Sequence, residues 1–110
     1  MSGQSSSSAG YGIGSAGSDD PCATLRLDRA LEAPVPGVAD ALGVGALLSV
    51  VLEEGPPPVV ALHTSSGALA GSIVPTVRLL ECLRQAVPFT AEVTGVGGGG
   101  SVRVEVRAVP

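Results

Sequence analysis

The amino-acid sequence predicts a mainly β fold with two helices, an α+β domain built on a small six-stranded, barrel-like antiparallel sheet. Three observations predict it: apolar and polar residues alternate over several segments, glycine-containing turns separate these segments, and one amphipathic segment is bounded by prolines. Alternation with a period of two is typical of a strand with one buried face, whereas an amphipathic segment is typical of a helix. The expected order of elements is β-α-β-β-β-α-β-β.

Composition divides the chain of 110 residues into a tail and one domain. Residues 1–20 hold a serine run and several glycines, with little that is large and apolar beyond Tyr11 and Ile13. Such a segment cannot bury enough surface to offset the entropy of ordering, so we expect a disordered Ser/Gly-rich tail. Residues 21–110 are expected to form the β-barrel domain. Because aromatic residues make up only 2% of the chain, its core must be aliphatic.

The first predicted strand covers Cys22–Leu27, where small or apolar residues alternate with polar ones. Pro34 and Pro36 follow; they lack an amide proton and cannot continue a ladder of strand hydrogen bonds. A short helix is then expected over Gly37–Leu42, with Gly43 as its stop signal.

The segment Gly45–Glu54 contains an apolar run with little alternation, which predicts a strand covered on both faces. A helix is the competing interpretation. A strand is favoured because adjacent valines are β-branched and because Pro56–Pro58 close the segment. These prolines are expected to form a stiff connector rather than a proline-motif ligand, which needs a longer exposed stretch.

A hairpin and a helix are predicted next. Val59–His63 and Ala68–Val74 alternate or are apolar, and small polar residues join them through a turn. Pro75 and Thr76 then open a helix that runs to about Ala86. Its apolar stripe is expected to lie across one mouth of the barrel.

The last predicted hairpin pairs Phe89–Thr94 with Val102–Arg107, both of which alternate strictly. The glycines of Gly95–Gly100 provide the turn, because they adopt positive φ without a Cβ penalty. A phosphate-binding loop is the alternative interpretation of Gly97–Gly100. Such a loop relies on amides at the start of a helix, and here a strand follows, so we expect a plain hairpin tip.

The two cysteines and the single histidine are the candidate reactive residues. Cysteines of cytosolic chains stay reduced, and the spacing of Cys22 and Cys82 forms no self-contained zinc site, so we expect neither a disulfide nor a bound metal. Cys82 is expected to be an inert thiol buried in the helix. His63 ends a strand beside serines with no carboxylate near in sequence, which favours a partly exposed histidine over a catalytic base.

A candidate binding face lies on the outward side of the predicted sheet. Arg103 and Arg107 share one strand face with Glu105, and Arg26 is expected on a neighbouring strand. Together with His63, these three arginines form the candidate face. A small mixed-charge patch of this kind is more typical of a solvated sheet face than of a phosphate-binding surface.

Charge and hydropathy narrow the classes of partner. The formal net charge of −4 weighs against binding to a nucleic-acid backbone and favours a protein partner. Neither an apolar run near the ~20 residues of a membrane helix nor a secretory signal is recognisable, so we expect a cytoplasmic protein without membrane association. All six basic residues are Arg, which together with abundant Ala, Gly, Val and Pro is typical of a GC-rich bacterial genome.

Three segments carry a resemblance to a known family: Val59–Leu62, Gly67–Ile73 and Phe89–Val93. A strand that ends in a turn, a glycine-containing strand, a helix and an aromatic-x-Ala-x-Val strand follow one another over about half of the chain. This order resembles HIRAN domains and related small OB-like barrels. The resemblance implies a six-stranded barrel that binds the end of single-stranded DNA. The chain departs from the family at the loop Glu54–Pro58, and apart from Phe89 it lacks aromatic residues for stacking on bases.

The sequence therefore predicts a non-enzymatic β-barrel module that binds a protein partner, as an accessory subunit of a larger enzyme or complex. No cofactor is expected. A single-stranded nucleic-acid binding module is the alternative, and a small enzyme dependent on Cys22, Cys82 or His63 is less favoured. An exposed sheet edge would also allow homo-oligomers.

Overall fold

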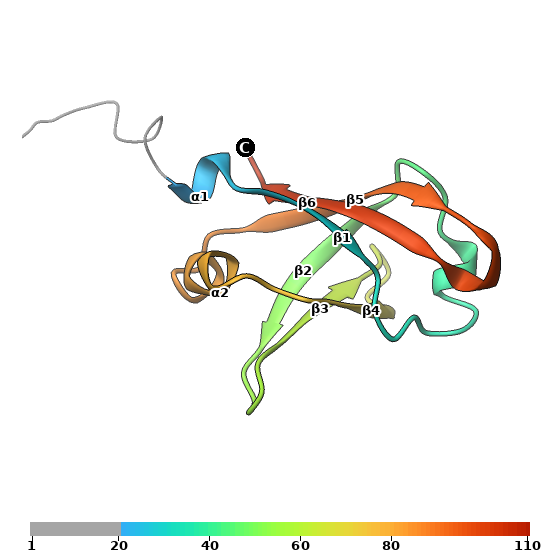
Figure 1. Ribbon diagram of the computed structural model, residues 1–110, viewed down its shortest axis with the longest axis horizontal. Coiled ribbons are helices and arrows are strands. Elements are labelled where there is room, and N and C mark those ends of the chain that lie inside the picture. The colour runs from blue at the N-terminus through green and yellow to red at the C-terminus, as the bar shows by residue number, and fades with distance from the viewer. Residues whose placement is uncertain (1–20) are drawn as a thin grey trace, which may run out of the picture.

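Six antiparallel strands form one strongly curled sheet in the computed structural model, which describes residues 21–110 (Figure 1). The predicted tail over residues 1–20 lies outside the described residues. The strand order is β1-β6-β5-β2-β3-β4, which confirms the predicted small barrel-like α+β fold as a curled half-barrel. The elements are α1 (Pro21–Thr24), β1 (Arg26–Ala30), η2 (Ala39–Ala41), β2 (Leu47–Glu53), β3 (Val59–His63), β4 (Leu69–Ile73), α2 (Val77–Arg84), β5 (Phe89–Val96), η3 (Gly98–Gly100) and β6 (Val102–Ala108).

The two outer strands of the curled sheet are joined just beyond the end of β1. Glu32 and Ser72 form an antiparallel bridge, with the Glu32 amide 2.7 Å from the Ser72 carbonyl and the Ser72 amide 2.9 Å from the Glu32 carbonyl. Three residues further on, the Val35 amide donates to the Ala70 carbonyl at 2.9 Å. The segment after β1 therefore occupies the outer edge of β4, and we call this junction the seam.

Gly71 and Arg29 allow the two segments of the seam to lie close together. Gly71 lies so close to the crossing segment that an added Cβ would stand 2.8 Å from the Glu32 carbonyl oxygen and from side-chain carbons of Leu31, so a side chain there would force the segments apart. Beyond β4, Nε of Arg29 donates to the Val74 carbonyl at 2.8 Å. A long side chain thus bridges the seam where backbone pairing has ended.

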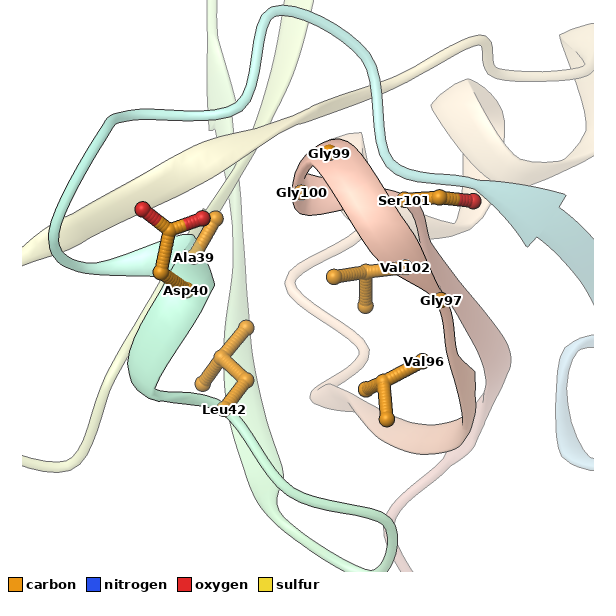
Figure 2. Close-up of a pocket in the computed structure, with 9 residues that line it drawn as sticks. All are labelled: Ala39, Asp40, Leu42, Val96, Gly97, Gly99, Gly100, Ser101 and Val102. Carbon is orange, nitrogen blue, oxygen red and sulfur yellow. The ribbon is translucent and has the colours of Figure 1, made fainter.

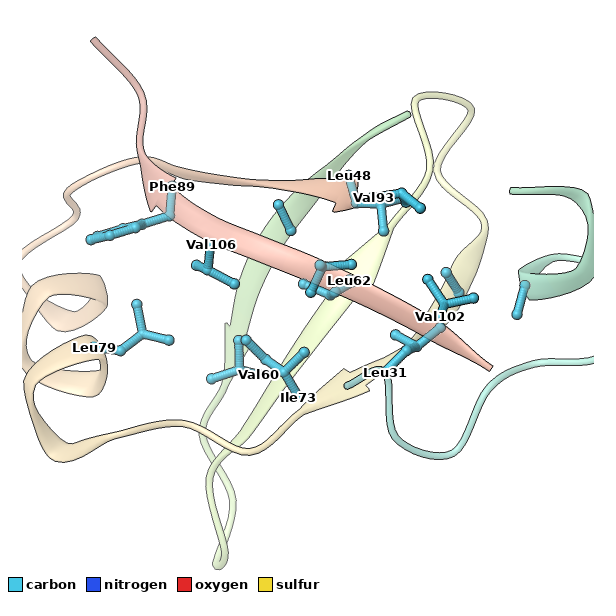
Figure 3. Packing of buried hydrophobic residues seen from close by; sticks show 14 of the residues in the cluster. Leu31, Leu48, Val60, Leu62, Ile73, Leu79, Phe89, Val93, Val102 and Val106 are labelled. Atoms are coloured by element: carbon cyan, nitrogen blue, oxygen red, sulfur yellow. The ribbon is translucent and has the colours of Figure 1, made fainter. Parts of the chain in front are cut away.

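Helix α2 covers one mouth of the sheet, as the amphipathic pattern predicts. Thr76 is its N-cap, with its hydroxyl accepting from the Leu79 amide at 3.1 Å. Leu79 is fully buried and points toward the strand residues Val60 and Val106 (Figure 3). The buried core is otherwise aliphatic, with Phe89 as its aromatic member.

The two cysteines form a disulfide, so the expectation of reduced thiols is wrong. Cys22 and Cys82 are both buried, their Cα atoms lie 5.8 Å apart, and their sequence separation is 60 residues. The predicted first strand is also displaced: residues 21–24 form α1, and β1 starts only at Arg26. The short helix α1 brings Cys22 onto α2, a contact that local sequence spacing does not reveal.

Strand β2 is covered on one face only, contrary to the prediction of two covered faces. Its burial alternates: Leu48 is buried, whereas Leu47 is 56% and Val51 is 40% exposed. The physical reason is that α2 lies across a mouth of the sheet and, within residues 21–110, no helix covers the outer face of β2 (Figure 1). The outward aliphatic side chains therefore remain in contact with solvent.

Removal of the Cys22–Cys82 disulfide is expected to lower the free energy of unfolding by up to about 4 kcal/mol, because the cross-link restricts the unfolded chain over a long loop. Urea unfolding of the oxidised protein, the reduced protein and the Cys22→Ala/Cys82→Ala variant measures this. The reduced protein and the double variant should agree. Two titratable thiols in the urea-unfolded, non-reduced protein would contradict the disulfide.

Candidate functional site

One transverse row on the outer face of the sheet contains three of the four predicted binding residues. Strand register sets it, because directly paired residues project from the same face. From β1 to β4, the row consists of Arg26, Arg107, Thr90, Ser49, His63 and Leu69. Arg26 and Arg107 are direct neighbours, but three strand spacings, about 14 Å, separate Arg107 from His63. Arg26, Arg107 and His63 therefore lie on the same surface of the sheet, but His63 is too far away to contact the two arginines.

The outer face of β1, β6 and β5 carries a network of ion pairs. It consists of Arg26, Asp28, Glu92, Arg103, Glu105 and Arg107. Arg107 contacts Glu92 at 3.0 Å and Glu105 at 3.4 Å, Arg26 contacts Glu105 at 3.5 Å, and Arg103 contacts Asp28 at 3.1 Å. Three arginines thus meet three carboxylates, which leaves no surplus of positive charge for a phosphate backbone.

Arg107 has a special place in this network. Glu92 and Glu105 are directly opposite each other in the β5–β6 register, an arrangement that like charges disfavour. The guanidinium of Arg107 reaches both carboxylates and is the least exposed of the paired arginines, at 27% of its side chain. It therefore offsets a repulsion that the strand pairing creates.

The outer face of β2, β3 and β4 carries exposed aliphatic side chains instead, interleaved with Ser49, Glu53 and His63. Leu47 and Val51 on β2, Val59 on β3 and Leu69 on β4 are 40–56% exposed. Register pairs the outward residues of these strands side by side, with Leu69 opposite His63 and Val51 opposite Ala61. We call Leu47, Val51, Val59 and Leu69 the apolar strip. The outer surface is therefore divided into a charged half, which the ion pairs cover, and a half where aliphatic side chains are exposed, which we call the apolar half.

His63 lies within the apolar half and lacks the surroundings of a catalytic base. Its side chain is half-buried, and in the described part of the chain its Nδ1 is buried without a hydrogen-bond partner. No carboxylate among residues 21–110 bonds to the ring. Both cysteines belong to the disulfide, so no thiolate is present to act as nucleophile beside it.

A hollow opens at the end of the half-barrel opposite α2, between η2 and the β5–β6 hairpin (Figures 1 and 2). Its volume is about 240 Å³. Aliphatic side chains of Leu42, Val96 and Val102 and the backbone of the glycine loop line it, and Asp40 is its single ionisable residue. Sequence reasoning did not single out Asp40, because only a long-range contact brings it next to the glycine loop.

An ion pair links the projecting β2–β3 hairpin to α2. Arg84 Nε and a terminal nitrogen bond the two carboxylate oxygens of Glu54 at 2.8 and 3.1 Å. These hydrogen bonds hold the pKa of Glu54 below its usual value of 4.5 and raise the pKa of Arg84. A carboxyl group whose pKa is lower in the folded than in the unfolded protein stabilises the fold at pH values above its unfolded-state pKa. This stabilisation is lost as the pH falls through the folded-state pKa. Both side chains are about half exposed, so the effect is small.

Comparisons with protein-family models, with curated proteins and with solved structures returned no match for this chain. The resemblance to HIRAN domains therefore rests on its sequence motifs. Two further observations concern residues 21–110 alone: no helix there is long and apolar enough to span a bilayer, and no group of three or more His, Cys, Asp or Glu side chains is placed to hold a metal ion.

Replacing Arg107 by Ala is expected to lower the free energy of unfolding by about 1 kcal/mol, because Glu92 loses its paired arginine and faces Glu105 without the cation that contacts both carboxylates. Arg26→Ala, which removes a more exposed and longer ion pair, is the matched control and should cost less. Urea unfolding at low and high salt measures both. Adding Glu92→Gln to Arg107→Ala should restore part of the loss; equal effects of the two arginine variants would contradict the role of Arg107.

Proposed function

We propose that this chain is a non-enzymatic interaction module that binds a protein partner through its apolar strip, as an accessory subunit of a larger enzyme or complex. The observation that carries the proposal is the division of the outer sheet face. Four exposed aliphatic side chains lie on the outer face of β2, β3 and β4, and charged residues follow on the neighbouring strand β5, where Glu92 is opposite Leu47. An apolar centre with a polar rim is the usual anatomy of a protein–protein interface.

The arrangement of charge favours a protein over a nucleic acid. Each arginine of the predicted binding face, Arg26, Arg103 and Arg107, already pairs with a carboxylate. A phosphate would have to displace these carboxylates, and the chain as a whole is negative. Binding of single-stranded DNA, which the HIRAN resemblance implies, therefore has less support than binding of a protein.

The non-enzymatic part of the proposal is supported by the surroundings of the candidate reactive groups. A Cys/His enzyme needs a thiolate held near an imidazole. Cys22 and Cys82 form a disulfide that joins α1 to α2, so neither is a free thiol. His63 lies on the outer face of the sheet, in the apolar half.

The disulfide also bears on location and on self-association. Stable disulfides are typical of oxidising compartments, so Cys22–Cys82 weighs against the predicted cytoplasmic location, which stays a prediction. The seam occupies the outer edge of β4, so a second copy has no open strand to pair with there. A bacterial origin likewise stays a prediction from composition.

Site-directed photo-crosslinking in the native host tests the proposal. A photoreactive side chain at position 47 should give one discrete adduct with another protein, because Leu47 lies in the apolar strip. The adduct should disappear when Leu69→Glu is added and persist when Arg78→Glu, at an exposed position of α2, is added instead. A photoreactive side chain at position 78 is the matched control.

Three results would contradict this function. Equal adducts from positions 47 and 78 would show that capture is unspecific. An adduct at twice the chain mass would identify a second copy in place of a different partner. An adduct that survives Leu69→Glu would place the contact outside the apolar strip.

A further inference from the structure

The end of the half-barrel opposite α2 has a continuous depression that the proposed interface does not use. Besides the hollow of about 240 Å³, a second hollow of about 290 Å³ opens beside it. The two share Ala39, Asp40, Gly99 and Gly100 as walls. The second hollow extends the depression toward Pro34, Val35 and Pro36, in the segment whose Val35 amide takes part in the seam.

The chemistry of these walls is simple. Asp40 is the single ionisable side chain that lines either hollow. Leu42 lies on the same side of the hollow as Asp40, and Val96 and Val102 lie on the facing β5–β6 hairpin (Figure 2). Val102 is buried. Val96 is 50% exposed, so this wall is open to a ligand rather than filled by the core. The depression thus combines one negative charge with apolar surface.

The Asp40 side chain is exposed at the depression, and one of its carboxylate oxygens is oriented by the loop that precedes it. Its Oδ2 accepts a hydrogen bond from the Gly37 amide at 3.2 Å. Among residues 21–110, no arginine pairs with Asp40 and no hydrogen bond reaches its Oδ1. The carboxylates of Asp28, Glu54, Glu92 and Glu105 each pair with an arginine instead.

The glycine loop keeps the approach to Asp40 clear. Gly99 and Gly100 have φ angles of 72° and 79°, a region that favours glycine. A Cβ on Gly100 would lie 3.4 Å from Oδ1 of Asp40, a tight contact. Because the loop carries no side chains at these positions, backbone atoms and open space surround the unpartnered oxygen.

We propose that this depression binds a primary alkylammonium group, with the ammonium on Oδ1 of Asp40 and the alkyl chain against Leu42 and Val96. An anion is disfavoured by the carboxylate. A guanidinium gains most from two parallel bonds to both oxygens of a carboxylate, and Oδ2 is already engaged by Gly37. A primary ammonium group can bind a single carboxylate oxygen, and the alkyl chain attached to it needs an apolar surface. Oδ1 of Asp40 and the side chains of Leu42 and Val96 provide these two contacts.

Titration of the 110-residue chain with n-butylammonium chloride, followed by amide NMR, tests this site. Saturable shifts are expected at Asp40, Val96 and the glycine loop, with sodium chloride as the ionic-strength blank. Asp40→Asn should weaken binding about tenfold, because it removes the charge from the hydrogen bond to the ammonium. Glu81→Gln, at an exposed carboxylate on α2 without an ion pair, is the matched control and should leave binding unchanged.

A second titration distinguishes the source of the ammonium. N-acetyl-lysine N-methylamide presents the same group as a protein lysine, so its binding would identify a lysine side chain as an acceptable ligand. Binding of butylammonium alone would identify a free small amine. Shifts that do not saturate, or that are equal in Asp40→Asn with an otherwise unchanged amide spectrum, would overturn the site. Failure here leaves the apolar strip untouched, because the two surfaces share no residue.

Discussion

The backbone bridge between Glu32 and Ser72 is the constraint on which the rest of this structure depends. A six-stranded antiparallel sheet can remain open, with two edges exposed to pairing by other chains. Here the segment after β1 crosses to β4 and exchanges two hydrogen bonds with it, and Gly71 allows the close approach. This bridge holds the sheet in its curled shape. The curled sheet has an inside, an outside and two ends, and these regions differ in chemistry.

Each of these regions has a separate role. The inside is aliphatic and fully buried over Val60, Leu62, Val104 and Val106, so it provides stability and offers no reactive group. One end is closed by α2 and fixed by the disulfide. The opposite end, with its single carboxylate, and the divided outer face are left as the surfaces that can meet other molecules.

Sequence reasoning predicted what local pattern determines. Strict alternation identified β5 and β6, and the proline-bounded amphipathic segment identified α2 and its position at a mouth. Sequence reasoning failed for the features that long-range contacts determine. The Cys22–Cys82 pairing depends on α1 turning back onto α2, the one-sided burial of β2 depends on where α2 lies, and the importance of Asp40 depends on the glycine loop reaching it. The network of ion pairs was predicted in part, with Arg103, Glu105 and Arg107 on one strand face and Arg26 on a neighbouring strand; the register that places Glu92 opposite Glu105 is tertiary information.

Native-state hydrogen exchange at the seam tests the account most directly. If the bridge closes the sheet, the amides of Glu32 and Ser72 should exchange only with global unfolding, at rates comparable to the β3 and β6 amides that pair on both sides. Exchange of these two amides as fast as an exposed loop amide such as that of Gly98, while the core strands stay protected, would contradict the closed half-barrel.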